Sequence, residues 1–333
     1  MTTLGSFPST RLRRHRIQPW IRDLHRETAL SPSDFIWPVF IREPKGEALI
    51  KTLPGVKRYT KEELVPAVEE ALTLGIKAVA LFPQIDPTLK KPNGREAWNP
   101  KNLVCQTIHF LKKYCPEMGI IADVALDPYT DHGHDGLLID GNIANDPTVE
   151  ALIQQALVLA EAGVDVLAPS DMMDGRIGTL RRALDAKGFL DLPLFSYSAK
   201  YASALYAPFR EAAGSKSCLK GASKATYQMD PANAKEALSE MAFDVEEGAD
   251  ALIVKPGTFY LDIIRQASDV FPLPIHAYHV SGEYSMLKSA SEAGYLPYEQ
   301  TLLENLLAFK RAGARAIWTY GAFDAAKILR SLS

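Results

Sequence analysis

The chain has 333 residues, of which 47% are hydrophobic and 23% are charged, and its formal net charge is −3 at pH 7. Such a chain can bury a large core, and its slight acidity argues against a dedicated nucleic-acid-binding protein. No apolar run approaches the roughly 18 residues of a membrane-spanning helix. The three cysteines form no CxxC pair, which fits a reducing, cytoplasmic setting and excludes zinc-finger spacing. We therefore expect a soluble, cytoplasmic enzyme that acts on small molecules and has no nucleic-acid or membrane partner.

The first segment, residues 1–34, contains the basic run RLRRHR and the apolar residues Trp20, Ile21 and Leu24. These apolar side chains would be exposed unless something covered them. One interpretation is a segment that caps the strands of its own chain. The interpretation that we favour is an extended arm that wraps a neighbouring subunit.

From residue 35 onward, a helical apolar pattern repeatedly ends at a glycine, and a short, almost entirely apolar run follows. A glycine suits the residue after a helix, where φ is positive, and such runs are typical of strands buried on both faces of a parallel sheet. The pattern predicts eight strands, at residues 35–41, 78–83, 119–126, 164–170, 193–198, 249–255, 275–281 and 316–321. Helices are expected between them, for example at residues 61–74, 100–114, 147–162, 231–247 and 297–312.

Eight strands that alternate with helices favour a closed (β/α)8 barrel, or TIM barrel, over residues 35–333. An open, doubly wound sheet is the alternative, but its first strand would lack the GxGxxG turn. In TIM barrels the reactive residues lie at the C-terminal ends of the strands and in the loops that follow. The strand ends therefore select the candidate site.

Two lysines lie at such strand ends. Lys255 directly follows the apolar run ALIV, and Lys200 follows the fifth expected strand, between Tyr197 and Tyr201. A lysine whose ammonium reaches solvent is one interpretation of each. Because strands five and six are neighbours in a barrel, the two ammonium groups could also approach each other, and burial and like charge both lower the pKa of a lysine. A neutral lysine forms a Schiff base with a ketone, so the pair predicts chemistry on carbonyl substrates.

The segment after Lys200 is basic and rich in Gly, Ser and Ala, and it carries Arg210, Lys216, Lys220 and Lys224. A solvated loop is the simpler interpretation. The alternative is a mobile lid over about residues 201–228, in which Arg210 and Lys224 bind substrate carboxylates.

The stretch DVALDPYTDHGHDG follows the third expected strand and carries Asp123, Asp127, Asp131 and Asp135. Its carboxylates suit either acid/base chemistry or a metal site. The ends of the other strands add Ser170, Asp171, Asp174, Ser281 and Tyr320.

Five segments, APSDMMDGRIG, YSAKYAS, YQMDPAN, VKPG and VSGEY, carry a family resemblance. Together they resemble porphobilinogen synthase, also known as 5-aminolevulinate dehydratase, and the resemblance covers nearly the whole chain. It implies a TIM barrel with an N-terminal arm, usually assembled as a homo-octamer. The implied activity is that of a hydro-lyase, which condenses two 5-aminolevulinate molecules to porphobilinogen with loss of two waters, an early step of tetrapyrrole (haem and chlorophyll) synthesis.

The resemblance also implies roles for individual residues. Lys200 would form a Schiff base with one substrate molecule, on the A side, and Lys255 with the other, on the P side. Arg210 and Lys224 would hold the A-side carboxylate. Lys224 stands at a position where the family more commonly has an arginine. A single ammonium cannot make the two parallel hydrogen bonds of a guanidinium, so the affinity for the A-side substrate is the property that this difference would affect. The remaining residues expected to contact substrate are Ser281 and Tyr320 at the P-side carboxylate, together with Asp123, Asp127, Asp135, Ser170, Tyr197 and Tyr206.

In zinc-dependent relatives the aspartate-rich stretch carries three cysteine ligands, and here those positions read Ala125, Asp127 and Asp135. Zinc prefers sulfur and nitrogen ligands, whereas carboxylates suit magnesium and similar hard cations. The resemblance therefore implies the aspartate-rich, magnesium-type branch, with no zinc at the active site. We expect the aspartates to serve as acid/base support for the substrate amino group. A metal bound directly by them, or by His132 and His134, is the alternative.

Relatives also bind an activating, allosteric magnesium at a glutamate in the helix before the sixth strand, and the matching residue is Glu240. By itself Glu240 is an ordinary helix carboxylate. Magnesium keeps most of its waters and often uses only one or two carboxylates, so a single protein ligand is reasonable. Whether a monovalent cation also binds stays open.

Two other functions fit the sequence less well. A class I aldolase needs one Schiff-base lysine and often a Gly-rich phosphate site after the last strands, whereas this chain has two lysines and no such glycine cluster. A catalytically inactive assembly protein would be expected to have lost a lysine, the lid cations or Ser281, and all are present.

Overall fold

The computed structural model describes residues 5–214 and 223–332. Within these residues eight parallel strands form a ring: β1 (Phe35–Arg42), β3 (Ala78–Gln84), β4 (Gly119–Val124), β7 (Val166–Pro169), β8 (Phe195–Lys200), β9 (Ala251–Lys255), β10 (Ile275–His279) and β11 (Ala316–Thr319). They pair in the order β7-β4-β3-β1-β11-β10-β9-β8. A parallel bridge between Leu167 and Leu194 joins β7 to the chain entering β8. The ring is closed, and the expected TIM barrel is confirmed.

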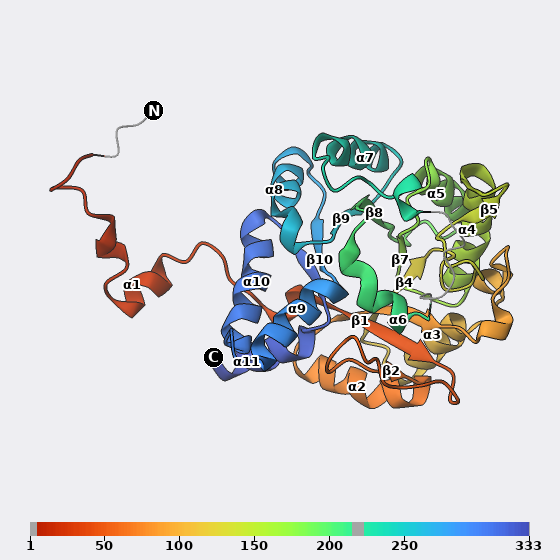
Figure 1. Ribbon diagram of the computed structural model, residues 1–333, viewed down its shortest axis with the longest axis horizontal. Helices are drawn as coiled ribbons and strands as arrows, with labels where there is room; N and C mark the ends of the chain where they lie inside the picture. Colours follow the sequence, from red (N-terminus) through yellow and green to blue (C-terminus); the bar gives the residue numbers. More distant parts are fainter. Residues whose placement is uncertain (1–4, 215–222, 333) are drawn as a thin grey trace.

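Helices surround the barrel, as Figure 1 shows. The expected helices correspond to α2 (Lys61–Thr73), α3 (Leu103–Tyr114), α4 (Asn145–Glu161), α7 (Lys235–Glu246) and α10 (Tyr298–Ala312). Elements that were not predicted individually are α5 (Arg176–Ala186), α6 (Ala207–Ala212), α8 (Leu261–Val270), α9 (Ser281–Glu292), α11 (Ala322–Leu332), the short β2 (Arg58–Tyr59), and the hairpin of β5 (Leu137–Ile139) and β6 (Asn142–Ala144).

The glycines that precede four of the predicted strands have the expected backbone conformation. Gly75, Gly163, Gly248 and Gly313 all have positive φ, between 87° and 116°. Each lies one or two residues after the last residue of a helix and turns the chain toward the next strand, a geometry that a residue with a Cβ adopts only with strain.

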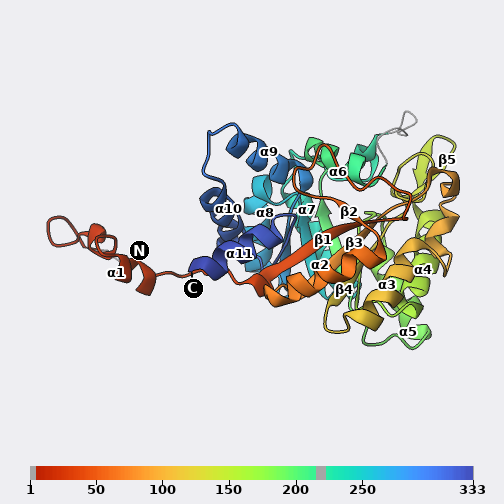
Figure 2. The same ribbon diagram turned by 90° about the horizontal axis from the view of Figure 1, so that it is seen from below.

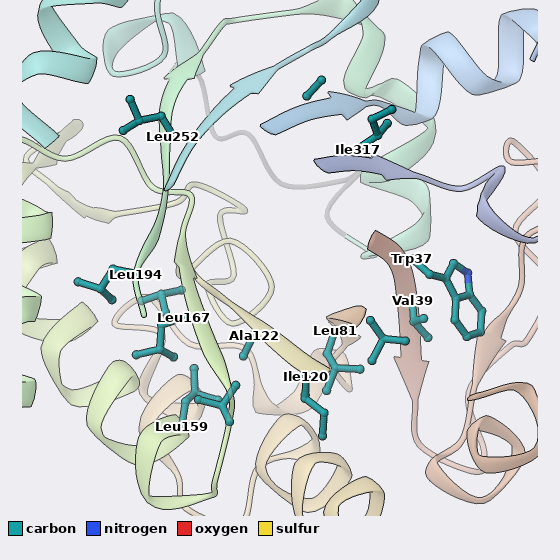
Figure 3. Packing of buried hydrophobic residues seen from close by; sticks show 14 of the residues in the cluster. Trp37, Val39, Leu81, Ile120, Ala122, Leu159, Leu167, Leu194, Leu252 and Ile317 are labelled. Atoms are coloured by element: carbon teal, nitrogen blue, oxygen red, sulfur yellow. The ribbon is translucent and has the colours of Figure 1, made fainter. Parts of the chain in front are cut away.

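The core has two layers, because alternate residues of each strand point to opposite faces. The layer between strands and helices contains Trp37 and Val39 of β1, Leu81 of β3, Ile120 of β4 and Leu252 of β9 (Figure 3). The layer inside the barrel is more aromatic and includes Phe40, Phe82, Tyr197, Tyr278 and Trp318. These inward-facing rings form the walls below the strand ends where the candidate residues lie.

The segment before β1 extends away from the barrel (Figures 1 and 2). It contains the short helix α1 (Pro19–Leu24), which has no buried residue, and its side chains Phe7, Leu12, Trp20 and Leu24 are exposed. The described part of the segment therefore does not cap its own strands, apart from the last turn, where Asp34 pairs with Lys310 at 2.9 Å. In the described part of the chain, no helix is long and apolar enough to cross a membrane.

Candidate active site

The two strand-end lysines lie side by side. Lys200 ends β8, Lys255 ends β9, and the two residues are direct partners in the parallel pairing. The pairing shifts by one residue between Ser196 and Ala199, where β8 has a bulge. Without that extra residue Ala199 would face Lys255, so the bulge brings the second lysine into register with the first. Both lysines are buried, with 6% and 7% of their surface exposed.

Lys255 lies in an aromatic enclosure. Its Nζ is 4.4 Å from the centroid of the Tyr278 ring, 5.0 Å from Tyr197, 5.2 Å from Phe209 and 5.5 Å from Tyr206. Burial, followed by the charge of Lys200, lowers the pKa of Lys255 to about 7. Although ring faces attract a cation, they do not replace the lost hydration. A large fraction of this amine is therefore neutral near neutral pH, which is the form that attacks a ketone.

Lys200 has polar neighbours instead. Its Nζ donates to Oδ2 of Asp135 at 3.1 Å and to the carbonyl of Ser170. The other oxygen of Asp135 accepts from Nζ of Lys224 at 2.8 Å, and Gln228 donates to the same carboxylate at 3.3 Å. Burial opposes ionisation of Asp135, but the two ammonium groups hold its pKa well below the usual range. Asp135 is thus an anion that bridges the strand-end lysine and a lid lysine.

The pKa values of Asp123 and Asp127 are shifted in the opposite direction from that of Asp135. Burial, followed by the charge of Asp127, raises the pKa of Asp123 to about 7. Burial, followed by the charge of Asp135, also raises the pKa of Asp127. A carboxyl group with a pKa of about 7, as in Asp123, can hold and release a proton near neutral pH, as general acids and bases must, and the pKa of Asp127 is shifted in the same direction. The aspartate-rich stretch therefore supplies one fixed anion and two proton-exchanging groups.

These residues line one small cavity at the C-terminal end of the barrel. Its free space is about 30 Å³, which is room for a couple of waters rather than for a substrate. The cavity is lined by Phe82, Asp123, Asp127, Asp135, Ser170, Lys200, Tyr206, Phe209, Arg210, Lys224, Gln228 and Lys255. The structure thus brings together most of the residues that the sequence selected, including the lid cations Arg210 and Lys224.

Ser281 and Tyr320 do not line this cavity. Ser281 Oγ accepts from the backbone N–H of Phe209 at 3.0 Å and donates to the carbonyl of Leu205 at 3.3 Å. The Tyr320 hydroxyl lies 3.4 Å from that of Tyr278. Because Phe209 belongs to α6, part of the expected lid is hydrogen-bonded directly to the residue expected to hold a substrate carboxylate.

The expected lid covers the end of the barrel. It includes α6 and the short 3-10 helix Lys224–Thr226, whereas Lys216 and Lys220 lie outside the described residues. Arg58, which the sequence analysis missed, fastens α6: its guanidinium donates to the carbonyls of Ala212 at 2.7 Å and Glu211 at 2.8 Å. Nothing in the local sequence indicates this role, because the two α6 carbonyls are more than 150 residues away from Arg58.

Other expected residues have structural roles or lie elsewhere. Asp171 pairs with the buried Arg176 and accepts from the backbone N–H of Met173, and Asp174 is exposed. The ring of His132 contacts the carbonyl of Pro92, and that of His134 contacts the Tyr227 hydroxyl. The two free cysteines in the described chain, Cys105 and Cys115, are buried among apolar side chains.

The candidate metal residue Glu240 lies outside the barrel, on α7. It lines a separate cavity of about 460 Å³ together with Asn145, Asp174 and Glu236. Burial raises the pKa of Glu240, while Arg176 opposes the shift. Among residues 5–214 and 223–332, no three His, Cys, Asp or Glu side chains are arranged as a ready-made metal site. An ion here would therefore be held by few protein oxygens and by water.

Comparison with known proteins agrees with this geometry. The family model described as delta-aminolevulinic acid dehydratase matches residues 9–328. The chain belongs to the delta-aminolevulinic acid dehydratase family. The dehydratase of Bradyrhizobium diazoefficiens is 50% identical over 322 residues, covering 96% of this chain and 91% of the relative. That of Rhodobacter capsulatus is 48% identical over 324 residues, covering 97% of both.

A solved structure gives the same result for the fold. The dehydratase of Toxoplasma gondii, in complex with the reaction product porphobilinogen, superposes with a TM-score of 0.94 at 46% identity, covering 96% of this chain and 91% of that one. The family assignment made from the sequence motifs is therefore confirmed, as is the hydro-lyase class that comes with it.

Proposed function

We propose that this chain is a porphobilinogen synthase, which condenses two molecules of 5-aminolevulinate to porphobilinogen with loss of two waters, an early step of tetrapyrrole synthesis. The observation that carries the proposal is the pair of buried lysines in register at the ends of β8 and β9. An aldolase of the Schiff-base type needs one such lysine, whereas joining two ketones through imines uses two.

The two lysines divide the work. Lys255 attacks the ketone of the P-side substrate and Lys200 that of the A-side substrate, and each imine formation releases one water. The imines acidify the neighbouring C–H bonds, so that one substrate becomes an enamine and forms the C–C bond. The amine of one substrate then closes the ring, and both lysines leave as free amines. Asp123 and Asp127 exchange protons with the substrate amino group, which their raised pKa values suit.

The substrate carboxylates are bound near the lid. Arg210 and Lys224 hold the A-side carboxylate, and Ser281 and Tyr320 hold the P-side carboxylate. Since the cavity has only about 30 Å³ of free space and α6 is hydrogen-bonded to Ser281, we infer that the lid opens for entry. After it closes again it excludes the water that would hydrolyse the imines.

Dehydratases of this family are metal-dependent enzymes, and we propose magnesium at Glu240 as the activating ion. The cavity offers carboxylate and amide oxygens from Glu240, Glu236, Asp174 and Asn145, a donor set that suits a hard, hydrated cation. The ion would supply charge stabilisation on α7, remote from the reacting carbons. The active-site stretch has no thiolate, and its anion Asp135 is already paired with two lysines, so we propose no zinc there.

The exposed arm supports a homo-oligomer. Trp20 and Leu24 are 64% and 71% exposed on a segment that leaves its own barrel, and covering them with a neighbouring subunit removes this apolar surface from water. We propose a cytoplasmic octamer in which residues 1–34 make these contacts.

Metal removal tests the function and the ion together. The chelated enzyme should form no or little porphobilinogen, magnesium should restore the activity, and zinc should not. Glu240→Gln should abolish the response to magnesium, whereas Glu246→Gln, an exposed change on the same helix, should leave it intact. Recovery with zinc alone would overturn the metal assignment, and absence of product with any metal would overturn the activity.

A further inference from the structure

Glu283 is a buried carboxylate that takes no part in the reaction steps proposed above. It lies in the first turn of α9 with 3% of its surface exposed. Its Oε2 accepts from the backbone N–H of Val280 at 2.8 Å, and its Oε1 accepts from the backbone N–H of Thr258 at 2.7 Å. A buried carboxylate is costly unless its oxygens are hydrogen-bonded, and here both of them are.

The two bonds differ in kind. A glutamate three residues after a helix N-cap commonly accepts from the N-cap N–H, as Glu283 does from Val280. The bond to Thr258 is not part of that local motif, because Thr258 lies in the loop after β9, whereas α9 follows β10. One side chain therefore joins the loops that leave two neighbouring strands.

These two loops carry the groups assigned to one substrate. Lys255, which forms the P-side imine, is three residues before Thr258, and Ser281, which binds the P-side carboxylate, directly follows Val280. The same lid segment also contacts both groups: the Tyr206 hydroxyl donates to the backbone carbonyl of Lys255 at 3.1 Å, and the Ser281 hydroxyl donates to the backbone carbonyl of Leu205 at 3.3 Å.

Each loop packs closely against a neighbouring segment at a glycine. A Cβ added to Gly257 would lie 2.7 Å from the Phe309 ring, and a Cβ added to Gly282 would lie 2.4 Å from the carbonyl oxygen of Leu205. Backbones packed this tightly move only if their neighbours move as well. The Glu283 carboxylate is therefore a fixed spacer between two constrained loops.

We propose that Glu283 is a positioning residue that sets the separation between Lys255 and Ser281, and thereby the number of carbons between ketone and carboxylate that the P side accepts. The inference rests on the proposed roles of Lys255 and Ser281. Glu283 touches no substrate and acts through the two loops. In 5-aminolevulinate two methylenes separate the ketone from the carboxylate, and this is the length that the spacer selects.

Two keto acids without an amino group test the proposal, because they stop at the imine. Levulinate has the same two methylenes between ketone and carboxylate, and 5-oxohexanoate has three. Reduction by borohydride fixes the imine as a secondary amine, and peptide mass spectrometry measures it at Lys255. The native enzyme should be trapped mainly by levulinate.

Glu283→Gln keeps the shape of the side chain but turns an –NH2 group toward a backbone N–H. A buried backbone N–H left without its acceptor predicts about 10-fold less trapping by levulinate and a similar rise in KM.

The selectivity is the readout that a purely structural role would not move. In Glu283→Gln the ratio of levulinate to 5-oxohexanoate trapping should fall toward one, and KM for 5-aminolevulinate should change more than kcat. Glu292→Gln, the same substitution at an exposed residue of the same helix, should leave ratio and KM unchanged. Glu283→Asp separates the two bonds: the shorter side chain still reaches its own N-cap but not Thr258, so it should also lose the selectivity.

The outcomes separate this inference from the function on which it rests. If the native enzyme is trapped at Lys255 and either Glu283 variant keeps the native ratio, the positioning role is wrong and the activity stands. If neither keto acid is trapped at Lys255 in the native enzyme, the proposed P-side assignment is wrong, and the positioning role falls with it. Loss of selectivity in both variants, with trapping at Lys255 retained, supports the inference.

Discussion

Lys255 and Lys200 are direct partners on adjacent strands, yet their amines have different neighbours. The Lys255 amine faces four aromatic rings in the described structure, and its pKa is lowered to about 7 by burial and by Lys200. The Lys200 amine donates to the Asp135 carboxylate and to the Ser170 carbonyl. An apolar enclosure favours the neutral nucleophile, whereas the polar contacts of Lys200 have to be given up before its lone pair can attack a ketone.

From this difference we propose an order in which the two imines form. We infer that Lys255 reacts first, because its amine is neutral near neutral pH and no described acceptor holds it. Lys200 reacts after a substrate carboxylate has drawn Lys224 away from Asp135 and the bridge has loosened. Two identical substrate molecules are thus distinguished by the surroundings of two identical side chains.

The largest effects are expected from replacing either lysine by methionine, which keeps the length and removes the amine. Lys255→Met and Lys200→Met should each lower kcat by at least about 10⁴-fold, as removal of a covalent nucleophile does. They should differ when trapped by borohydride with levulinate: Lys200→Met keeps an imine at Lys255, whereas Lys255→Met forms very little. Equal trapping in both variants would show that the two amines are equally reactive, and the proposed difference between Lys255 and Lys200 would be wrong.

The next largest effect is expected from Asp135→Asn, which removes the anion that bridges Lys200 and Lys224. Removing one member of a buried ion pair leaves uncompensated charge and costs about 3 kcal/mol of folding stability. We expect a lower unfolding temperature and about a 100-fold fall in kcat, because Lys200 loses its orienting partner. Asp140→Asn, the same change at an exposed residue, is the control. Native-like stability in Asp135→Asn would mean that the bridge is not formed in solution.

The pH dependence sharpens the comparison further. A lysine with a pKa of about 7 is protonated below that pH, so the rate of levulinate trapping at Lys255 should fall about tenfold per pH unit below neutrality and level off above it. Because the Lys200 charge contributes to the lowering, Lys200→Met should move the midpoint upward. A midpoint near the ordinary value of a lysine in the native enzyme would contradict the neutral nucleophile.

The sequence located the strands well because most are nearly continuous apolar runs, and four of them start shortly after Gly75, Gly163, Gly248 or Gly313. The strand ends then selected Lys200, Lys255, Asp123 and Asp135 without any knowledge of contacts. The alternation of apolar and polar residues along a strand does not reveal an extra residue in one strand. The bulge that aligns Lys200 with Lys255 was therefore not predicted. The fifth strand, predicted to end at residue 198, continues to Lys200.

The partners of the site residues were less predictable than the residues themselves. The contact of Asp135 with Lys224 spans 89 positions. Gln228 and Phe209 line the site because the lid segments fold over the end of the barrel, which the sequence does not show. Glu283 shows the limit most clearly. Neither Glu283 nor its helix was singled out from the sequence. The bond to Val280 is local to the start of α9, but the bond to Thr258 depends on the packing of β9 against β10.

The smallest effect is expected at Lys224, where the family resemblance implies an arginine as the commoner residue. A single ammonium donates to Asp135 at 2.8 Å, whereas the guanidinium of Lys224→Arg would offer two parallel N–H groups to a substrate carboxylate. We expect KM for 5-aminolevulinate to fall about threefold with little change in kcat, because the arginine would contact the A-side carboxylate equally in ground and transition states. Lys224→Met should raise KM, and Lys187→Arg, at an exposed position, should change neither constant. If Lys224→Arg instead lowers kcat, the bridge between Lys224 and Asp135 contributes to the chemistry, and the A side depends on the lysine as closely as the P side does.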